Sequence, residues 1–265
     1  MQCREIIAKL DALAPRTLAC DWDNPGLLAG RSGKEIHRVL VALDATDAVV
    51  ELAKTEQVDM LITHHPLIFK PLRAVNDENF ISRCVVSLLQ ADIAYFAMHT
   101  NFDIAPGCMA DLAAVRLDLV PEGPLEVTAE MDGSAVGIGK IGMLPEPMRV
   151  AELAALVKKQ FSLPFVTVYG ADRVAEPVQR IAVSPGAGGS MLAHGLAARV
   201  PVLVTGDIGH HDGIDAAENH MAVIDAGHYG LEHIFIPFVR EYLEGVFPGE
   251  LEVLEAPLSF PSYMV

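Results

Sequence analysis

The sequence has little tryptophan, little basic charge and no long apolar run. It holds one tryptophan in 265 residues, and 19 lysines and arginines stand against 35 aspartates and glutamates, a formal charge of −16. An acidic chain repels phosphate backbones, so we expect no nucleic acid among its partners. No apolar run reaches the ~20 residues that span a bilayer, so we expect no membrane segment.

Cysteine is also scarce. Cys3, Cys20, Cys84 and Cys108 are scattered without a CxxC pair, which argues against a disulfide framework and against a zinc ribbon. Charges near the N-terminus stand where a secretory signal needs an apolar core. We therefore expect a soluble cytoplasmic protein. The chain also lacks a nucleophile elbow, a P-loop and a cysteine with an evident partner base.

Apolar residues make up 51% of the chain, enough for a substantial core. Short β-branched runs alternate with helical periodicity, and the order strand, helix, strand over residues 38–63 predicts a parallel βαβ unit. We predict an α/β fold of two interlinked lobes with mixed, mostly parallel sheets. A composition shift at residues 121–124 places the lobes at residues 1–124 and 125–265. Helices are expected at residues 6–14, 80–90, 109–116, 150–160, 215–219 and 231–247.

Histidines and carboxylates gather just after the predicted strands. In open α/β sheets the carboxyl ends of strands share one edge, where ligands collect. A single histidine in such a place is usually a half-exposed loop residue, but four strand ends with histidine favour a metal site. The groups are His64 with His65, His99 with Asp103, His210 with His211, and His228 with Glu232.

The residue types limit the metal. Imidazole nitrogens and carboxylate oxygens suit Zn, Fe, Mn, Co or Ni, whereas Ca and Mg want mostly oxygen. The vicinal pair His64–His65 follows a strand, where alternate side chains leave on opposite sides, so each imidazole can serve a different ion. We therefore expect two divalent ions per chain. Two ions bridged by a carboxylate lower the pKa of a shared water and supply a hydroxide nucleophile.

Two loops leave alternatives open. The glycine loop at residues 186–190 is either a tight strand-to-helix turn or an anion cradle in which Gly188 and Gly189 hold a substrate phosphate. His194, four residues beyond it, is expected on a helix surface. The turn-rich segment at residues 21–28 is either a surface turn pinned by a buried Trp22 or a loop that lines a site.

The motifs THHP, HTNFD, TGDIGHH and DAGHYGLE, with WDNPGLLAG upstream, closely resemble one family. It is the dinuclear-metal-centre hexamer family, also described as GTP cyclohydrolase I type 2-like, and the resemblance spans about residues 22–232. It implies that His64 and His65 bind different metals and that Asp103 and His228 are ligands. It also implies that Glu232 bridges the two ions. The positions that line the same cavity, as candidates for catalysis or substrate contact, are His99, Asp207, His210 and His211.

Two features depart from the family pattern. Longer members carry a regulatory-type α/β insert, for which the stretch between Asp103 and His228 is too short. The sequence DNPG stands where many members have DNVG, away from any ligand. The resemblance further implies a homohexamer with the metal sites facing an internal cavity.

Three functions compete at this point. The first is a metal-dependent cyclohydrolase whose metal-bound hydroxide attacks the imidazole ring of GTP or a related small phosphorylated substrate, with His210 or His211 as proton shuttle. The second is a non-catalytic metal store, metal-insertion factor or chaperone. The third is a scaffold whose metals are structural, in which case removal of the metals collapses the fold.

Overall fold

The computed structural model describes residues 1–260 together with Ser262 and Tyr263. Contacts divide the chain into two compact units that exchange segments. The first unit comprises residues 1–102 and 235–258, and the second comprises residues 103–234 and 259–265. The chain passes from one unit to the other within α4 (Thr100–Ile104) and returns between α9 (His228–Glu232) and α10 (Phe235–Val246).

The first unit is built on a five-stranded sheet of order β1-β4-β3-β2-β11. The three pairings among β4, β3, β2 and β11 are parallel, and β1 runs antiparallel to β4. Leu40 stands opposite Leu61 in the β2–β3 pair, so the predicted βαβ unit is confirmed. The strands are β1 (Gly26–Ala29), β2 (Arg38–Ala42), β3 (Met60–Thr63), β4 (Ala94–Ala97) and β11 (Glu252–Glu255).

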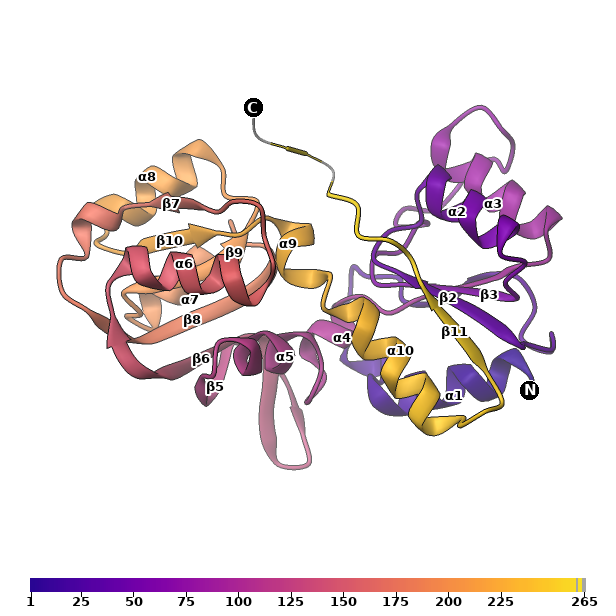
Figure 1. Ribbon diagram of the computed structural model, residues 1–265, viewed down its shortest axis with the longest axis horizontal. Coiled ribbons are helices and arrows are strands. Elements are labelled where there is room, and N and C mark those ends of the chain that lie inside the picture. The colour runs from indigo at the N-terminus through magenta and orange to yellow at the C-terminus, as the bar shows by residue number, and fades with distance from the viewer. Residues whose placement is uncertain (261, 264–265) are drawn as a thin grey trace. The chain divides into compact units, whose positions relative to one another are not determined.

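Helices cover both faces of this sheet. Figure 1 shows α2 (Asp47–Thr55) and α3 (Phe80–Gln90) on one face, with α1 (Cys3–Leu13) and α10 on the other. The strands are buried on both sides and read as continuous apolar runs, as is typical of parallel sheets. Their alternate residues, such as Leu40 and Leu61, join the core under α2 and α3.

The second unit carries a six-stranded mixed sheet of order β5-β6-β8-β9-β10-β7. Its inner pairs β8–β9 and β9–β10 are parallel, and the outer pairs are antiparallel. The strands are β5 (Val120–Met131), β6 (Ser134–Met148), β7 (Thr167–Tyr169), β8 (Val178–Ala187), β9 (Val202–Gly206) and β10 (Ala222–Asp225). The helices of this unit also include α5 (Met109–Arg116), α6 (Val150–Gln160), α7 (Met191–Ala197) and α8 (His210–Glu218), with a short 3₁₀ turn η2 (Ala171–Arg173). A second short 3₁₀ turn, η1 (Arg16–Leu18), belongs to the first unit.

The two mixed sheets confirm the predicted α/β class, and the helices at residues 80–90, 109–116 and 150–160 are found at their predicted bounds. β5 runs through residues 124 and 125, and the division into lobes at that point stays a prediction. None of the helices in the described residues is both long and apolar enough to cross a membrane.

Two predicted helices were wrong in extent. The helix expected at 231–247 is two helices, α9 and α10, broken at His233–Ile234. Pro237 explains the break, because its ring clashes with the carbonyl four residues earlier and it has no N–H to donate. The helix expected at 215–219 begins earlier, at His210, where Asp212 accepts a hydrogen bond from the Gly209 N–H.

Asp59, just before β3, ties the start of two strands together. Its carboxylate accepts hydrogen bonds from the backbone N–H groups of His37 (2.8 Å) and Arg38 (3.1 Å), with the Lys34 ammonium 3.4 Å away. Burial alone raises the pKa of Asp59, but these hydrogen bonds and the Lys34 charge outweigh it and hold the pKa below its usual value. The charged carboxylate is therefore the stabilising form.

Asp59→Asn should lower the free energy of unfolding at pH 7 by on the order of 1–3 kcal/mol, the cost of losing hydrogen bonds to a charged group. Because the folded pKa is lowered, this stabilisation is present above the unfolded pKa of about 3.9 and is lost as pH falls through the folded value. Urea unfolding from pH 7 to pH 3 measures it, with Asp77→Asn as an exposed control. A variant that tracks the wild type at pH 7 would contradict the role of Asp59.

Candidate functional site

The two adjacent histidines of THHP follow β3 directly, as predicted. His64 is buried and its Nδ1 donates to the Met98 carbonyl at 2.7 Å, while the Nδ1 of His65 donates to the Asp44 carboxylate at 2.8 Å. The Thr63 hydroxyl donates to the His65 carbonyl at 2.8 Å, which fixes the turn. Both rings are therefore held by one nitrogen and present Nε2 as the nitrogen with a lone pair.

Tyr95 supports the same turn through its hydroxyl group. Its hydroxyl accepts a hydrogen bond from the Leu67 N–H at 2.7 Å and lies 2.8 Å from the Thr63 hydroxyl. Burial raises the pKa of Tyr95 well above its usual value, so it stays a neutral phenol. The turn that presents the two imidazoles thus rests on a fully buried, uncharged support.

His99 joins this pair to form what we call the histidine cluster, His64, His65 and His99. The His99 ring lies 5.4 Å from that of His64 and 5.6 Å from that of His65, between centroids. The three residues offer ring nitrogens that all lie within 4.8 Å of one another, close enough to share a metal ion. The strands β3 and β4 end side by side in a parallel pair, which brings the three histidines together.

Asp23 organises the loop beside the histidine cluster. Its carboxylate accepts from the Nδ1 of His99 at 2.7 Å and from the backbone N–H and the hydroxyl of Thr100 at 3.0 and 2.5 Å. Burial alone raises the pKa of Asp23, but the hydrogen bonds from His99 and Thr100 outweigh it and lower the pKa to about 2. Asp23 is therefore a fixed negative charge that orients His99.

The reading of residues 21–28 as a turn pinned by a buried tryptophan was wrong. Trp22 is 60% exposed, and the loop is held by Asp23 instead. Sequence reasoning missed Asp23 and Asp44 as partners of the histidines. Asp44 could have been found, because it is the first polar residue after β2 at the edge where β3 ends.

In the second unit, His228 and Glu232 lie one turn apart on α9, which we call the α9 pair. The His228 Nε2 is 3.0 Å from Oε2 of Glu232, a residue that is 2% exposed. The His228 Nδ1 donates to Asp207 Oδ2 at 2.9 Å. Two carboxylates around one imidazole favour a proton or a metal cation between Nε2 and Glu232. The predicted spacing of four residues on one helix face is confirmed.

Backbone geometry at the ends of β8 and β9 shapes the α9 pair. Gly186 has a φ of +90°, and a Cβ there would lie 2.8 Å from Glu232 Oε1. Asp207 adopts a φ of +53° at the end of β9, where its carboxylate meets His228. A positive φ at a residue other than glycine costs energy and tends to occur at functional sites.

The other predicted positions differ in their surroundings. Asp103 is half-buried on α4, and its charge helps to raise the pKa of Cys108. His210 and His211 are exposed at the start of α8, with ring centroids 5.2 Å apart. The notion that they shuttle protons stays a prediction.

The glycine loop has a packing explanation. A Cβ at Gly188 would lie 2.3 Å from the Thr205 side chain, and one at Gly189 would lie 3.3 Å from the Asp212 carboxylate. The close contact to Thr205 requires glycine, and the nearby negative charge opposes a phosphate. Phosphate binding by Gly188 and Gly189 stays a prediction.

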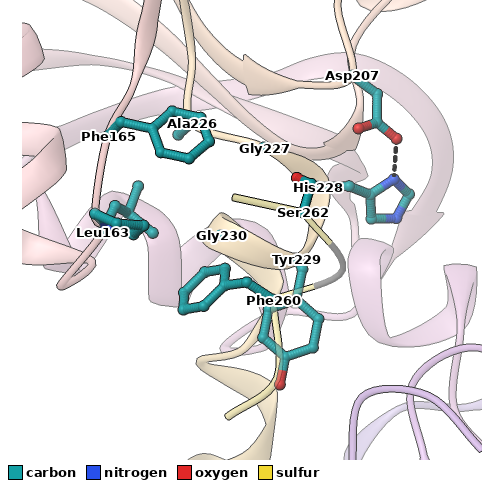
Figure 2. A pocket seen from close by; sticks show the side chains of 11 residues that line it. Leu163, Phe165, Asp207, Ala226, Gly227, His228, Tyr229, Gly230, Phe260 and Ser262 are labelled. Atoms are coloured by element: carbon teal, nitrogen blue, oxygen red, sulfur yellow. Dashed lines mark hydrogen bonds and ion pairs between the residues drawn. The ribbon is translucent and has the colours of Figure 1, made fainter. Parts of the chain in front are cut away.

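A small cavity of about 100 Å³ opens beside His228 within the second unit. Figure 2 shows the His228 ring and its hydrogen bond to Asp207 at one side, with the apolar side chains of Leu163 and Phe165 at the other. Pockets for drug-sized ligands measure ~300–1,000 Å³. The cavity is therefore too small for a nucleotide.

The donor set fits a transition metal better than other chemistry. The three residues of the histidine cluster and His228 each have Nδ1 fixed by a carboxylate or carbonyl, the arrangement that orients metal-binding imidazoles and increases their basicity. The thiols of Cys84 and Cys108 are poor nucleophiles, because burial raises the pKa of each to about 12. The histidine cluster can therefore bind a metal through its ring nitrogens, and the α9 pair offers a nitrogen and an oxygen donor in the second unit.

Comparisons with known proteins agree with the motifs. A family model described as Duf34/NIF3 (NGG1p interacting factor 3) matches residues 1–259. A Streptomyces coelicolor protein named GTP cyclohydrolase 1 type 2 homolog is 36% identical, covering 86% of this chain and 80% of the relative. A Helicobacter pylori protein named GTP cyclohydrolase 1 type 2 is 32% identical, covering 91% and 90%.

Solved structures show the same fold. The Bacillus cereus protein related to NIF3 matches with a TM-score of 0.92 at 23% identity, over 100% of this chain and 99% of that one. Reduced HcgD from Methanocaldococcus jannaschii matches with a TM-score of 0.81 at 30% identity, over 96% and 97%. The family model and the relatives together confirm the resemblance drawn from the motifs, and the chain belongs to the Duf34/NIF3 (NGG1p interacting factor 3) family.

Proposed function

We propose that His64, His65, Asp103, His228 and Glu232 would hold two divalent metal ions. The observation that carries the proposal is the fixation of every imidazole in this set by its Nδ1. Met98, Asp44 and Asp207 supply the acceptors. Such partners hold the ring orientation and the tautomer that a metal requires.

The two proposed carboxylate ligands lie near the points where the chain passes from one unit to the other. Asp103 lies on α4, at the point where the chain leaves the first unit, one turn beyond His99. Glu232 ends α9, three residues before the chain returns to the first unit at Phe235.

The mixture of three imidazoles and two carboxylates suits Zn, Fe, Mn, Co or Ni. A pair of such ions, when bound, acts as a Lewis acid and lowers the pKa of a bound water. Around it, Asp23 holds the Nδ1 proton of His99, so that His99 Nε2 is the nitrogen that can accept a proton. His99 is therefore the candidate proton acceptor with the clearest geometry, ahead of His210 and His211.

We favour a metal-dependent hydrolase that opens the imidazole ring of GTP or a related small phosphorylated compound in the cytoplasm. The names of the Streptomyces coelicolor and Helicobacter pylori relatives support this substrate class. The second candidate is a metal store, metal-insertion factor or chaperone, which the small size of the cavity beside His228 favours. The homohexamer implied by the resemblance stays a prediction.

Metal content tests the ligand set. Protein reconstituted with Zn²⁺ or Mn²⁺ and desalted should carry two ions per chain by elemental analysis. His65→Ala and Glu232→Gln should each lower the affinity for at least one of the ions by on the order of tenfold or more, since each removes a direct ligand. His220→Ala, an exposed histidine, is the control. Wild-type metal content in both ligand variants would refute the proposed set.

A pair of glycine variants isolates the position of Glu232. Gly186→Ala and Gly133→Ala both place a Cβ on a residue with positive φ, of +90° and +76°, but only Gly186 faces Glu232. Both should lose roughly 1–2 kcal/mol of stability from the backbone conformation. Only Gly186→Ala should also lose metal affinity, measured by chelator competition. Equal metal affinities in the two variants would show that Glu232 is not a metal ligand.

Turnover distinguishes the two candidate functions. Metal-loaded wild-type protein incubated with GTP should release formate, and His65→Ala should not. Formation of formate at the same rate in both would point to a contaminant. Bound metal without turnover, together with transfer of that metal to a competing chelator or apo-protein, would instead support the store or chaperone.

A further inference from the structure

The exposed rings of Trp22 and Phe69 contact each other and His99, a member of the histidine cluster. Ring centroids lie 5.8 Å apart for Trp22 and Phe69, 6.0 Å for Trp22 and His99, and 6.3 Å for Phe69 and His99. Trp22 and Phe69 are 60% and 42% exposed. His99 contacts both the exposed rings and the two buried-side histidines, so the aromatic patch continues directly into the histidine cluster.

Hydrogen bonds fix the loop that carries the exposed Trp22 side chain. The backbone around it is fixed by Asp23 and Thr100, and the Asn24 side chain donates to the Ile68 carbonyl at 2.9 Å, next to Phe69. The loop that carries Trp22 and the loop that carries Phe69 are thus tied to each other. A large apolar ring held rigidly in solvent is typical of a binding surface, because it loses little entropy when a partner covers it.

Two basic residues follow Phe69 closely in the sequence of a strongly acidic chain. Lys70 follows Phe69 directly, Arg73 lies three residues further on, and both are exposed. Neither takes part in an ion pair within the residues that the structure describes. Aromatic faces with adjacent cations are the combination that binds a nucleic-acid base and its phosphates.

We propose that Trp22 and Phe69 form a stacking platform for the planar heterocycle of a phosphorylated substrate, with Lys70 and Arg73 contacting its phosphates. The inference rests on the proposed function in one respect, since it takes the histidine cluster as the reacting end of the site. It names the residues that select a nucleotide over phosphorylated compounds that lack an aromatic base. The cavity beside His228, at about 100 Å³, is too small for that role.

Trp22 is the single tryptophan of the chain, so its fluorescence reports on the platform without any need for turnover. Metal-loaded full-length protein is titrated with GTP, with guanosine and with inorganic triphosphate in separate arms. GTP and guanosine should quench the emission, because a base stacks on the indole. Triphosphate alone should not. Absence of quenching by GTP would overturn the proposal.

Matched variants assign the contacts. Phe69→Ala should weaken GTP binding about tenfold or more, in line with the loss of one base-stacking ring, while Phe80→Ala, a 43% exposed phenylalanine on α3, should leave binding unchanged. Lys70→Ala with Arg73→Ala should weaken GTP but not guanosine. Equal loss in the Phe69 and Phe80 variants would refute the platform.

The outcomes separate this inference from the proposed function. Quenching that depends on Phe69, without formate release, would leave the platform standing and refute the hydrolase. Formate release with an unchanged KM for GTP in Trp22→Ala and Phe69→Ala would support the hydrolase and refute the platform. A change in oligomeric mass of these two variants by light scattering, without quenching by GTP, would show that a second copy of the chain covers the rings instead.

Discussion

The candidate site depends on one repeated interaction, the hydrogen bond that each histidine makes through its Nδ1. A backbone carbonyl holds His64, and carboxylates hold His65, His99 and His228. Without such a partner an imidazole can rotate and exchange tautomers, and the free energy of metal binding would be reduced by the cost of fixing both. Here the fold has already ordered the rings, so Nε2 is the donor atom in each case.

The acceptors come from positions that the sheets bring together. Asp44 follows β2 and His65 follows its parallel neighbour β3, while Asp207 follows β9 and His228 follows its neighbour β10. Each unit therefore uses the same device, an aspartate after one strand that orients a histidine after the next. Parallel pairing makes this possible because the carboxyl ends of neighbouring strands lie at the same edge.

The exposed aromatic rings follow from the same network. Asp23 orients His99, and the same carboxylate fixes the loop on which Trp22 stands. One buried charge thus determines both the direction of a histidine and the presentation of an aromatic surface. This coupling gives a physical reason for a rigid, solvent-exposed tryptophan beside the histidine cluster, which composition alone cannot supply.

Much of the architecture could be read from the sequence. Apolar runs and helical periodicity determined the α/β class, the βαβ unit and helices such as α3 and α6, since these depend on local spacing. The order of histidines after strands, and the motifs of the Duf34/NIF3 family, determined which side chains to consider as ligands. The break between α9 and α10 was also encoded, in Pro237, although the helical pattern on both sides concealed it.

Only the tertiary structure decided which acidic residue meets which histidine. Asp23 and His99 are 76 residues apart, and Asp44 and His65 are 21 apart, so no local pattern links them. Tertiary structure also decided that Trp22 is exposed, because the hydrogen bonds of Asp23 rather than burial of the indole hold its loop. Periodicity records which face of an element is apolar, whereas these pairings depend on the register between strands and on loop paths, which short-range sequence patterns do not specify.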